Sequence, residues 1–283
     1  HRTFVRLAIA CVLVVVGWGS SAGAWDTTAG SDTNYGSITF GGTGTDYSYG
    51  VAVDGSGNVY TTGYFEGTVD FGAGDVTSAG GRDGFVTKYN AAGVHQWTNT
   101  FGSDLDAAGQ GVAVDSAGNV YVTGYFVGIV DFGSGDVRTL RFSTVEVFVT
   151  KYNAAGVHQW TDAFGGVSGD RGKSVAVDGS GNVYTTGNFK GTINFGAGDV
   201  TATGVNWDIY ITKLNSSGVH QWTNTYGETP TDYGYGIALD TAGNIHVTGT
   251  FGGTVDFGAG DVTSAGLSLI HISEPTRPER ISV

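Results

Sequence analysis

Aspartates that recur in short glycine-rich turns are the side chains of this sequence that most resemble cation ligands. Calcium binds about six to eight oxygen atoms, so a calcium loop needs several carboxylates close together in the chain. The first motif reads Asp-x-x-Gly-Asn, and its copies lie at Asp54/Asn58, Asp115/Asn119, Asp178/Asn182 and Asp240/Asn244. Two of the copies carry alanine between these residues, and Asp and Asn are also typical of tight turns. We therefore interpret them as turn formers and predict no metal ligands here.

A second acidic motif, DFGAGD, places a carboxylate at each end of a glycine-rich loop. Its pairs are Asp70/Asp75, Asp131/Asp136 and Asp256/Asp261, and Asn194 replaces the first aspartate in the third copy. Such a loop can wrap a cation, but two carboxylates are few for calcium. We interpret the motif as a solvated loop tip, and a calcium-stabilised adhesin remains an alternative.

Histidine, tryptophan and lysine also recur at fixed positions. The sequence VHQW places His95, His158 and His220 two residues before Trp97, Trp160 and Trp222, and lysine recurs at Lys88, Lys151 and Lys213. Strand alternation would put each histidine and its tryptophan on one face, so we expect imidazole to pack on indole. We expect each lysine to form an ion pair inside its unit or to lay its aliphatic stem along apolar surface. No Ser/His/Asp set stands apart from these repeats, so we predict no catalytic and no cofactor-binding residues.

These motifs belong to one repeating unit. The segment that starts at Asp54 (DGSGNVYTTGYF) returns three times, and its asparagines at 58, 119, 182 and 244 are 61, 63 and 62 residues apart. Within a unit, the pattern predicts strands over Gly50–Asp54, Asn58–Phe65, Gly84–Asn90 and Val94–Phe101. The glycine-rich stretch between the second and third strands can hold a further small hairpin. The segment Tyr35–Asp46 matches the end of a unit and should supply an outer strand.

The second strand of the unit carries bulky residues on both faces, which indicates packing on both sides. Val59 and Phe65 lie on one face, and Tyr60 and Tyr64 lie on the other. Four antiparallel strands of about 62 residues, packed between neighbouring copies, are typical of a β-propeller blade. A β-solenoid would need shorter rungs, and a row of separate sandwich domains would need longer units. We therefore predict an all-β, incomplete β-propeller with three full blades and parts of a fourth.

The residues VAVDGSGNVYTTGYF, followed by DGFVTKYN and a tryptophan strand, resemble the bacterial β-propeller repeat known as SBBP. The resemblance covers nearly all of residues 35–266 and returns in every unit. It implies a propeller of several blades in an exported protein, often as one part of a larger surface protein. It implies no activity.

Both ends of the chain differ from the repeat region, 25–266. Residues 1–24 resemble the remnant of a signal peptide, because Arg2 and Arg6 precede the apolar run Leu7–Val16 and a cleavage motif at Ala22–Ala24. The run is too short for a membrane anchor, and a lipoprotein signal centred on Cys11 is a further alternative. Residues 267–283 begin LSLIHISEPTR, which resembles a translated sequencing adapter, so we expect a non-native tail and a fourth unit without its third strand.

Composition limits the function that the repeat can have. The chain has 13 basic and 26 acidic residues, a net charge of −13, which disfavours binding of nucleic acid. The sequence predicts a secreted, periplasmic or cell-surface scaffold without membrane insertion after signal cleavage, whose partner is a protein, a glycan or a small ligand. The alternative is the propeller portion of an extracellular lyase or hydrolase. Against catalysis, the first strands read GVAVD, GVAVD, SVAVD and GIALD, with nothing reactive except the turn aspartate. Specificity is expected where the repeats diverge, at Leu140–Glu146 and Glu228–Asp232.

Overall fold

The fold of the chain is seen in a computed structural model, which describes residues 11–14, 37–141, 143–229, 231–264 and 268–274. These residues form strands and turns, and no helix among them could cross a membrane. The predicted signal remnant lies mostly outside the described residues, apart from strand β1 (Cys11–Val14).

Each of the first three units contains four antiparallel strands that pair in chain order. The first sheet contains β3 (Tyr47–Val53), β4 (Val59–Phe65), β7 (Asp83–Tyr89) and β8 (His95–Phe101). A tight turn joins β3 to β4, where Gly57 has a φ of 79° and its N–H donates to the carbonyl of Asp54 at 3.0 Å. Every residue of β4 is buried, as the bulk on both of its faces predicts.

The next two units repeat this sheet. The second contains β9 (Ala107–Val114), β10 (Val120–Val127), β13 (Val145–Tyr152) and β14 (His158–Gly166). The third contains β15 (Arg171–Val177), β16 (Val183–Lys190), β19 (Trp207–Leu214) and β20 (His220–Tyr226). The predicted four-stranded unit and the all-β class are confirmed.

The fourth unit differs from expectation. It contains β21 (Tyr233–Leu239), β22 (Ile245–Phe251) and β25 (Ser268–Glu274), and β25 pairs antiparallel with β22 from Ile245↔Glu274 to Phe251↔Ser268. The expectation that this unit lacks a third strand is wrong for the described chain. The residues SLIHIS of β25 include two isoleucines, which favour strands, and β25 takes the edge of β22 that third strands take in the other units.

A small hairpin follows the second strand of every unit, as the glycine-rich stretch allowed. The hairpins are β5 (Thr68–Asp70) with β6 (Asp75–Thr77), β11 (Ile129–Asp131) with β12 (Asp136–Arg138), β17 (Thr192–Asn194) with β18 (Asp199–Thr201), and β23 (Thr254–Asp256) with β24 (Asp261–Thr263). The phenylalanine in the turn of each hairpin packs into the hydrophobic core. In the second unit, Phe132 packs 4.7 Å from Phe148.

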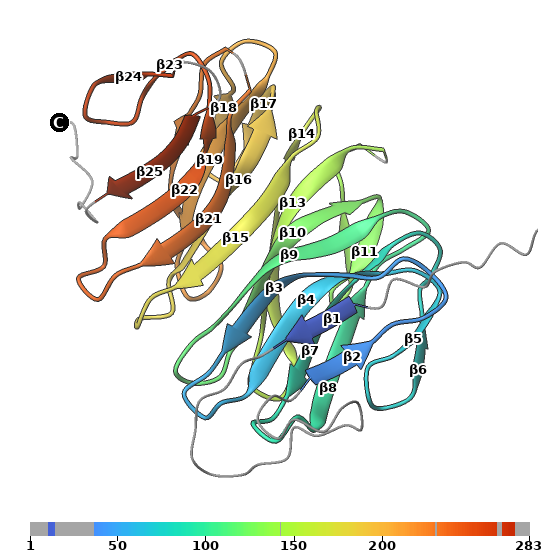
Figure 1. The fold of residues 1–283 in the computed structure, drawn as a ribbon. Coiled ribbons are helices and arrows are strands. Elements are labelled where there is room, and N and C mark those ends of the chain that lie inside the picture. The colour runs from blue at the N-terminus through green and yellow to red at the C-terminus, as the bar shows by residue number, and fades with distance from the viewer. Residues whose placement is uncertain (1–10, 15–36, 142, 230, 265–267, 275–283) are drawn as a thin grey trace, which may run out of the picture.

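The core lies between the units, which follow one another in chain order from the β3 sheet to the β21 sheet (Figure 1). An aromatic residue at or near the end of each outer strand packs into the unit that follows. Phe101 at the end of β8, for example, lies 5.2 Å from Phe132 and 5.1 Å from Phe148. Each sheet is therefore held by its neighbours.

The N-terminal segment contains a strand where its sequence predicts an outer strand, but among the described residues this strand joins the sheet of no unit. Strand β2 (Ser37–Phe40) pairs with β1, and Phe40 packs against Phe71 and Phe85 of the first unit. This contact matches that of Phe101 with the second unit. Strands β2 and β25 lie at opposite ends of the stack (Figure 1).

Candidate functional site

The aspartates of the Asp-x-x-Gly-Asn turns are occupied by internal hydrogen bonds. One oxygen of Asp54 accepts the N–H groups of Ser56 at 2.9 Å and Asn58 at 3.0 Å, and the other accepts the Asn58 amide at 2.7 Å and the Tyr60 hydroxyl at 2.9 Å. Burial acts to raise the pKa of Asp54, but these hydrogen bonds outweigh it and lower the pKa. The carboxylate therefore joins the turn to the following strand.

The aspartates of the DFGAGD hairpins also serve the local backbone. Asp70 accepts the N–H groups of Gly72 at 2.7 Å and Gly74 at 2.9 Å, and these bonds lower its pKa. Both glycines have positive φ, 113° and 108°, which other residues adopt only with strain. A single side-chain oxygen is enough for this role, so Asn194 can accept from Gly196 at 2.7 Å in the third unit.

The histidines and tryptophans do not share a face, which corrects the expectation from strand alternation. Between β7 and β8, Tyr89 pairs with His95 and Lys88 pairs with Trp97, because a bulge at Gln96 shifts the register. His95 therefore lies edge-on to Tyr89, with ring centroids 5.7 Å apart, and Trp97 lies on the other face near Tyr60.

The recurrent lysines hold neighbouring units together. The ammonium of Lys88 lies 5.1 Å from the ring centroid of Tyr60, and its contact is repeated by Lys151 over Tyr121 and Lys213 over Tyr184. Lys88 and the Trp97 indole both donate to the carbonyl of Ala154 in the next unit, at 3.4 Å and 3.2 Å. The lysine makes a cation–π contact and an inter-unit hydrogen bond, so the ion-pair alternative is not what the structure shows.

The two stretches where the repeats diverge each fold over a buried acid. In Leu140–Glu146, Glu146 is 2% exposed and accepts the N–H of Leu140 at 2.5 Å. In Glu228–Asp232, Asp232 is fully buried and accepts the N–H groups of Glu228 at 3.0 Å and Gly252 at 2.9 Å. These contacts recur at Asp83 and Asp170 in other units, so a role in specificity for the divergent residues stays a prediction.

The first strand of every unit contains a bulge that the sequence analysis missed. In β3, Ser48 pairs with Gly63 and Gly50 pairs with Thr62, which leaves Tyr49 without a partner across the ladder. The residues left out in this way are Tyr49, Gln110, Lys173 and Tyr235. The strand predicted over Gly50–Asp54 begins earlier, at Tyr47, so the bulge residue lies outside the segment GVAVD that the sequence pattern marked as the first strand. Bulges re-aim side chains and are frequent beside functional sites.

Glycine on the second strand makes the bulge possible. A Cβ atom at Gly63 would lie 1.8 Å from the carbonyl oxygen of Tyr47, and one at Gly124 would lie 1.9 Å from that of Ala108. An isolated glycine inside a strand pattern is itself a signal for a bulge or a close backbone approach. The Thr-Gly step of every second strand is therefore the sequence feature that could have revealed the bulge.

Residues that differ among the units gather around these bulges. We name Tyr47, Tyr49, Tyr64, Arg82, Gln110, Tyr125, Arg171 and Lys173 the inner cluster. In its first part, the rings of Tyr47 and Tyr49 stack with centroids 6.1 Å apart, and they lie 5.3 Å and 5.9 Å from the ring of Tyr64. Tyr47 and Tyr49 remain 41% and 48% exposed, so their rings are available to a ligand.

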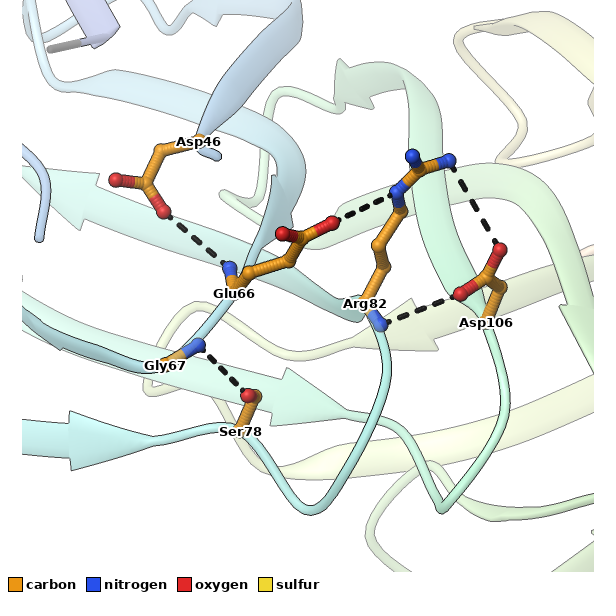
Figure 2. Close-up of polar contacts among 6 residues, drawn as sticks. All are labelled: Asp46, Glu66, Gly67, Ser78, Arg82 and Asp106. Atoms are coloured by element: carbon orange, nitrogen blue, oxygen red, sulfur yellow. Dashed lines mark hydrogen bonds and ion pairs between the residues drawn. The ribbon is translucent and has the colours of Figure 1, made fainter. Parts of the chain in front are cut away.

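Arg82 packs against Tyr64 of the cluster and binds two acidic residues. Its guanidinium carbon lies 4.9 Å from the ring centroid of Tyr64, and its Nε donates to Glu66 at 3.1 Å. Its Nη1 lies 3.8 Å from Asp106, which also accepts the Arg82 backbone N–H at 3.3 Å (Figure 2). Asp46 accepts the N–H of Glu66 at 3.3 Å and so fixes the loop that carries this acid (Figure 2). The arginine is thereby held by the first two units.

The cluster continues into the second and third units. The pKa of Tyr49 is raised by burial and by Tyr125, and the nearby side chain of Gln110 acts to lower it. Gln110 accepts from the Lys173 ammonium at 3.3 Å. The guanidinium carbon of Arg171 lies 5.0 Å from the ring centroid of Tyr125. Side chains of β15 thus contact those of β9 and β10, beside Tyr49 of β3.

Comparisons with known proteins agree with this architecture. Residues 96–125, 159–188 and 221–250 match the family model of the SBBP β-propeller repeat, so each match joins the outer strand of one unit to the first two strands of the next. An uncharacterized WD repeat-containing protein, L264, of Acanthamoeba polyphaga mimivirus is 29% identical over 189 residues, which cover 60% of this chain and 14% of that protein. The regulatory protein FlaEY of Caulobacter vibrioides is 29% identical over 159 residues, which cover 54% of this chain and 16% of that protein.

This chain therefore spans a small part of the length of the relatives that it matches. The family matches and the repeated four-stranded sheets both indicate that the unit is a β-propeller repeat. The chain is an all-β protein of repeated antiparallel sheets, and three of its segments match the SBBP β-propeller repeat.

Proposed function

We propose that this chain is a non-catalytic scaffold that binds a protein partner through the inner cluster. The main support for the proposal is that recurrent and non-recurrent polar and aromatic residues have different roles in the structure. Those that recur in each unit make turns and inter-unit contacts, whereas those that differ meet at the bulges of neighbouring first strands.

The composition of the inner cluster supports a protein partner. Tyr and Arg are enriched at the energetically dominant positions of protein interfaces, because they combine a large apolar area with hydrogen-bonding groups. Half of the inner cluster is tyrosine, and two of its rings are partly exposed side by side. The printed names of the relatives, a WD repeat-containing protein and a regulatory protein, fit this reading.

The proposal can be tested by selecting peptides from a phage-displayed random dodecapeptide library on the purified chain. The selected peptides should lose at least tenfold in affinity when Tyr49 is replaced by alanine, measured by calorimetry. Val157→Ala removes an exposed apolar side chain, 57% accessible, outside the cluster and should leave the affinity unchanged. Equal affinity for the wild type and Tyr49→Ala contradicts the proposal, and so does Tyr49-dependent binding confined to glycans on a glycan array.

Export is part of the proposal. It is supported by the apolar run Leu7–Val16 and the small residues Ala22–Ala24 that follow it. After expression in a bacterial host, the protein recovered from the periplasm should begin at Trp25, as read by N-terminal sequencing. Recovery from the cytoplasm with residues 1–24 attached would contradict export.

We also propose that residues 267–283 are not native, which makes this chain a fragment of a longer bacterial protein. The eleven-residue match of Leu267–Arg277 to a translated adapter supports this origin. Long-read sequencing of the gene should continue after Gly266 with a sequence like GFVTKYN. A genomic sequence that encodes LSLIHISEPTR would contradict it.

A further inference from the structure

Most cations whose contacts are described already have partners. Arg82 is bound to Glu66 and Asp106, and Arg138 lies 3.2 Å from Asp136. Lys88, Lys151 and Lys213 lie over tyrosine rings and donate hydrogen bonds or contribute to packing between units. In a chain with a net charge of −13, this engagement of cations is expected.

Arg171 and Lys173 differ from the other cations because they form a pair within the inner cluster. They lie two residues apart at the start of β15, and neither takes part in any ion pair found among the residues that the structure describes. Arg171 is exposed over the ring of Tyr125, and Lys173 donates to Gln110 alone among the described hydrogen bonds. Burial, followed by the charge of Arg171, lowers the pKa of Lys173. A nearby anion would offset both effects.

The bulge explains why two cations meet at this place. The ladder skips Lys173 between Gly172 and Ser174, so its side chain is aimed toward Gln110 of the preceding unit. The same register position carries Tyr49, Gln110 and Tyr235 in the other units. The cationic pair is thus a local feature of the third unit. Its hydrogen-bond partner Gln110 occupies in β9 the position that Tyr49 occupies in β3, and these two strands pack together.

We propose that Arg171 and Lys173 receive a carboxylate from an acidic segment of the protein partner, while Tyr47 and Tyr49 receive an apolar side chain of the same segment. This inference rests on the proposed function and names the chemistry of the partner. A guanidinium and an ammonium side by side offer several donors to one carboxylate, and such charge-assisted bonds are stronger than neutral ones. The net negative charge of the chain favours a single local carboxylate over a nucleic acid, whose many phosphates it would repel.

The test uses fluorescein-labelled hexapeptide pools and the full chain. One position is fixed as Asp or Glu, as Asn or Gln, or as Lys or Arg, and the other positions are mixtures that include aromatic residues. The wild type should bind the acidic pool at least tenfold more tightly than the amide pool. About 500 mM NaCl should reduce this ratio, because salt screens the partly exposed pair.

Variants separate this inference from the proposed function. Lys173→Gln and Arg171→Gln should each bring the ratio of acidic to amide binding near one. Lys173→Arg, which keeps the positive charge, should keep the wild-type ratio. Arg138→Gln, which changes the same charge on an exposed hairpin, should keep the wild-type ratio. If the wild type binds all three pools equally but binding still requires Tyr49, the acidic partner is refuted and the scaffold function stands. If binding does not require Tyr49, the proposed function itself is refuted.

Discussion

At the scale of single residues, this chain uses carboxylates to complete backbone turns and junctions. Asp54 and Asp70 remain charged because several donors surround them, and their pKa values are lowered. Asp170 has a different environment, since it is fully buried at a junction between units and accepts only the N–H groups of Gly166 and Lys190, each at 3.1 Å. Burial raises its pKa to about 7. The two kinds of aspartate must therefore respond to pH in opposite directions.

Asp170 should make the protein less stable as the pH rises toward neutrality. Because its folded-state pKa, about 7, exceeds that of an unfolded aspartate, about 3.9, its stabilising effect is complete below pH 4 and lost as the pH approaches 7. The urea midpoint of the wild type should fall between pH 4 and 7, and Asp170→Asn should reduce this slope. Asp240, whose pKa is lowered to about 2 chiefly by Asn244, is the control, since Asp240→Asn should leave the slope unchanged. An unchanged slope in Asp170→Asn would contradict the assignment.

At the scale of elements, the bulge and the glycine opposite it form one device. The bulged backbone approaches the second strand so closely that a side chain there would meet a carbonyl oxygen. The bulge leaves one residue of each first strand unpaired in the ladder. This position can therefore be Tyr, Gln or Lys while the pairing on either side of it is kept. The repeated sheets can thus carry different side chains at the same position of each unit.

Gly124→Ala should therefore destabilise the protein by about 1–3 kcal/mol, the usual range for a forced overlap in a packed site. Its Cβ would lie 1.9 Å from the carbonyl oxygen of Ala108. Gly55→Ala is the matched control, because a Cβ there meets nothing within 4 Å, and its effect should stay within about 0.5 kcal/mol. Urea denaturation of both variants makes the comparison, and equal stabilities would mean that the bulge does not require glycine.

The sequence predicted the elements better than the details inside them. Hydrophobic alternation and glycine turns located the four strands and the small hairpin, because those signals repeat in every unit. The two bulges escaped, at Tyr49 and at Gln96, since simple alternation assumes an unbroken ladder. As a result, the histidines were assigned to the wrong face and the bulge residues were left outside the first strands. The glycine at position 63 was the available clue to the first bulge.

At the scale of the whole molecule, stability comes from contacts between successive units. An aromatic residue at or near the end of each outer strand packs into the next unit, as Phe101, Phe164 and Tyr226 do, and Phe40 of β2 packs into the first unit in the same way. Repeat proteins of this kind gain stability from nearest-neighbour interfaces, so losing one interface can uncouple the units on either side.

Phe101→Ala should cost about 3–5 kcal/mol and separate the first unit from the second. Hydrogen exchange should show amides of β4 and β7 opening before those of β16 and β19, whereas the wild type should open these regions together. Val94→Ala, at a side chain that is 57% exposed, should change neither stability nor exchange. Cooperative exchange retained in Phe101→Ala would show that this contact does not couple the units.

The central claim is that binding resides in the residues that differ among the units, and that the recurrent residues serve packing. The most direct measurement compares Tyr49→Ala with Trp160→Ala for both thermal stability and affinity for the peptides selected on the wild type. Tyr49 is 48% exposed in the inner cluster, whereas the Trp160 indole donates to Ser216 of the next unit at 3.2 Å. The account predicts that Tyr49→Ala keeps the melting temperature and loses at least tenfold in affinity, and that Trp160→Ala lowers the melting temperature while its folded fraction binds normally. The opposite pattern would contradict it.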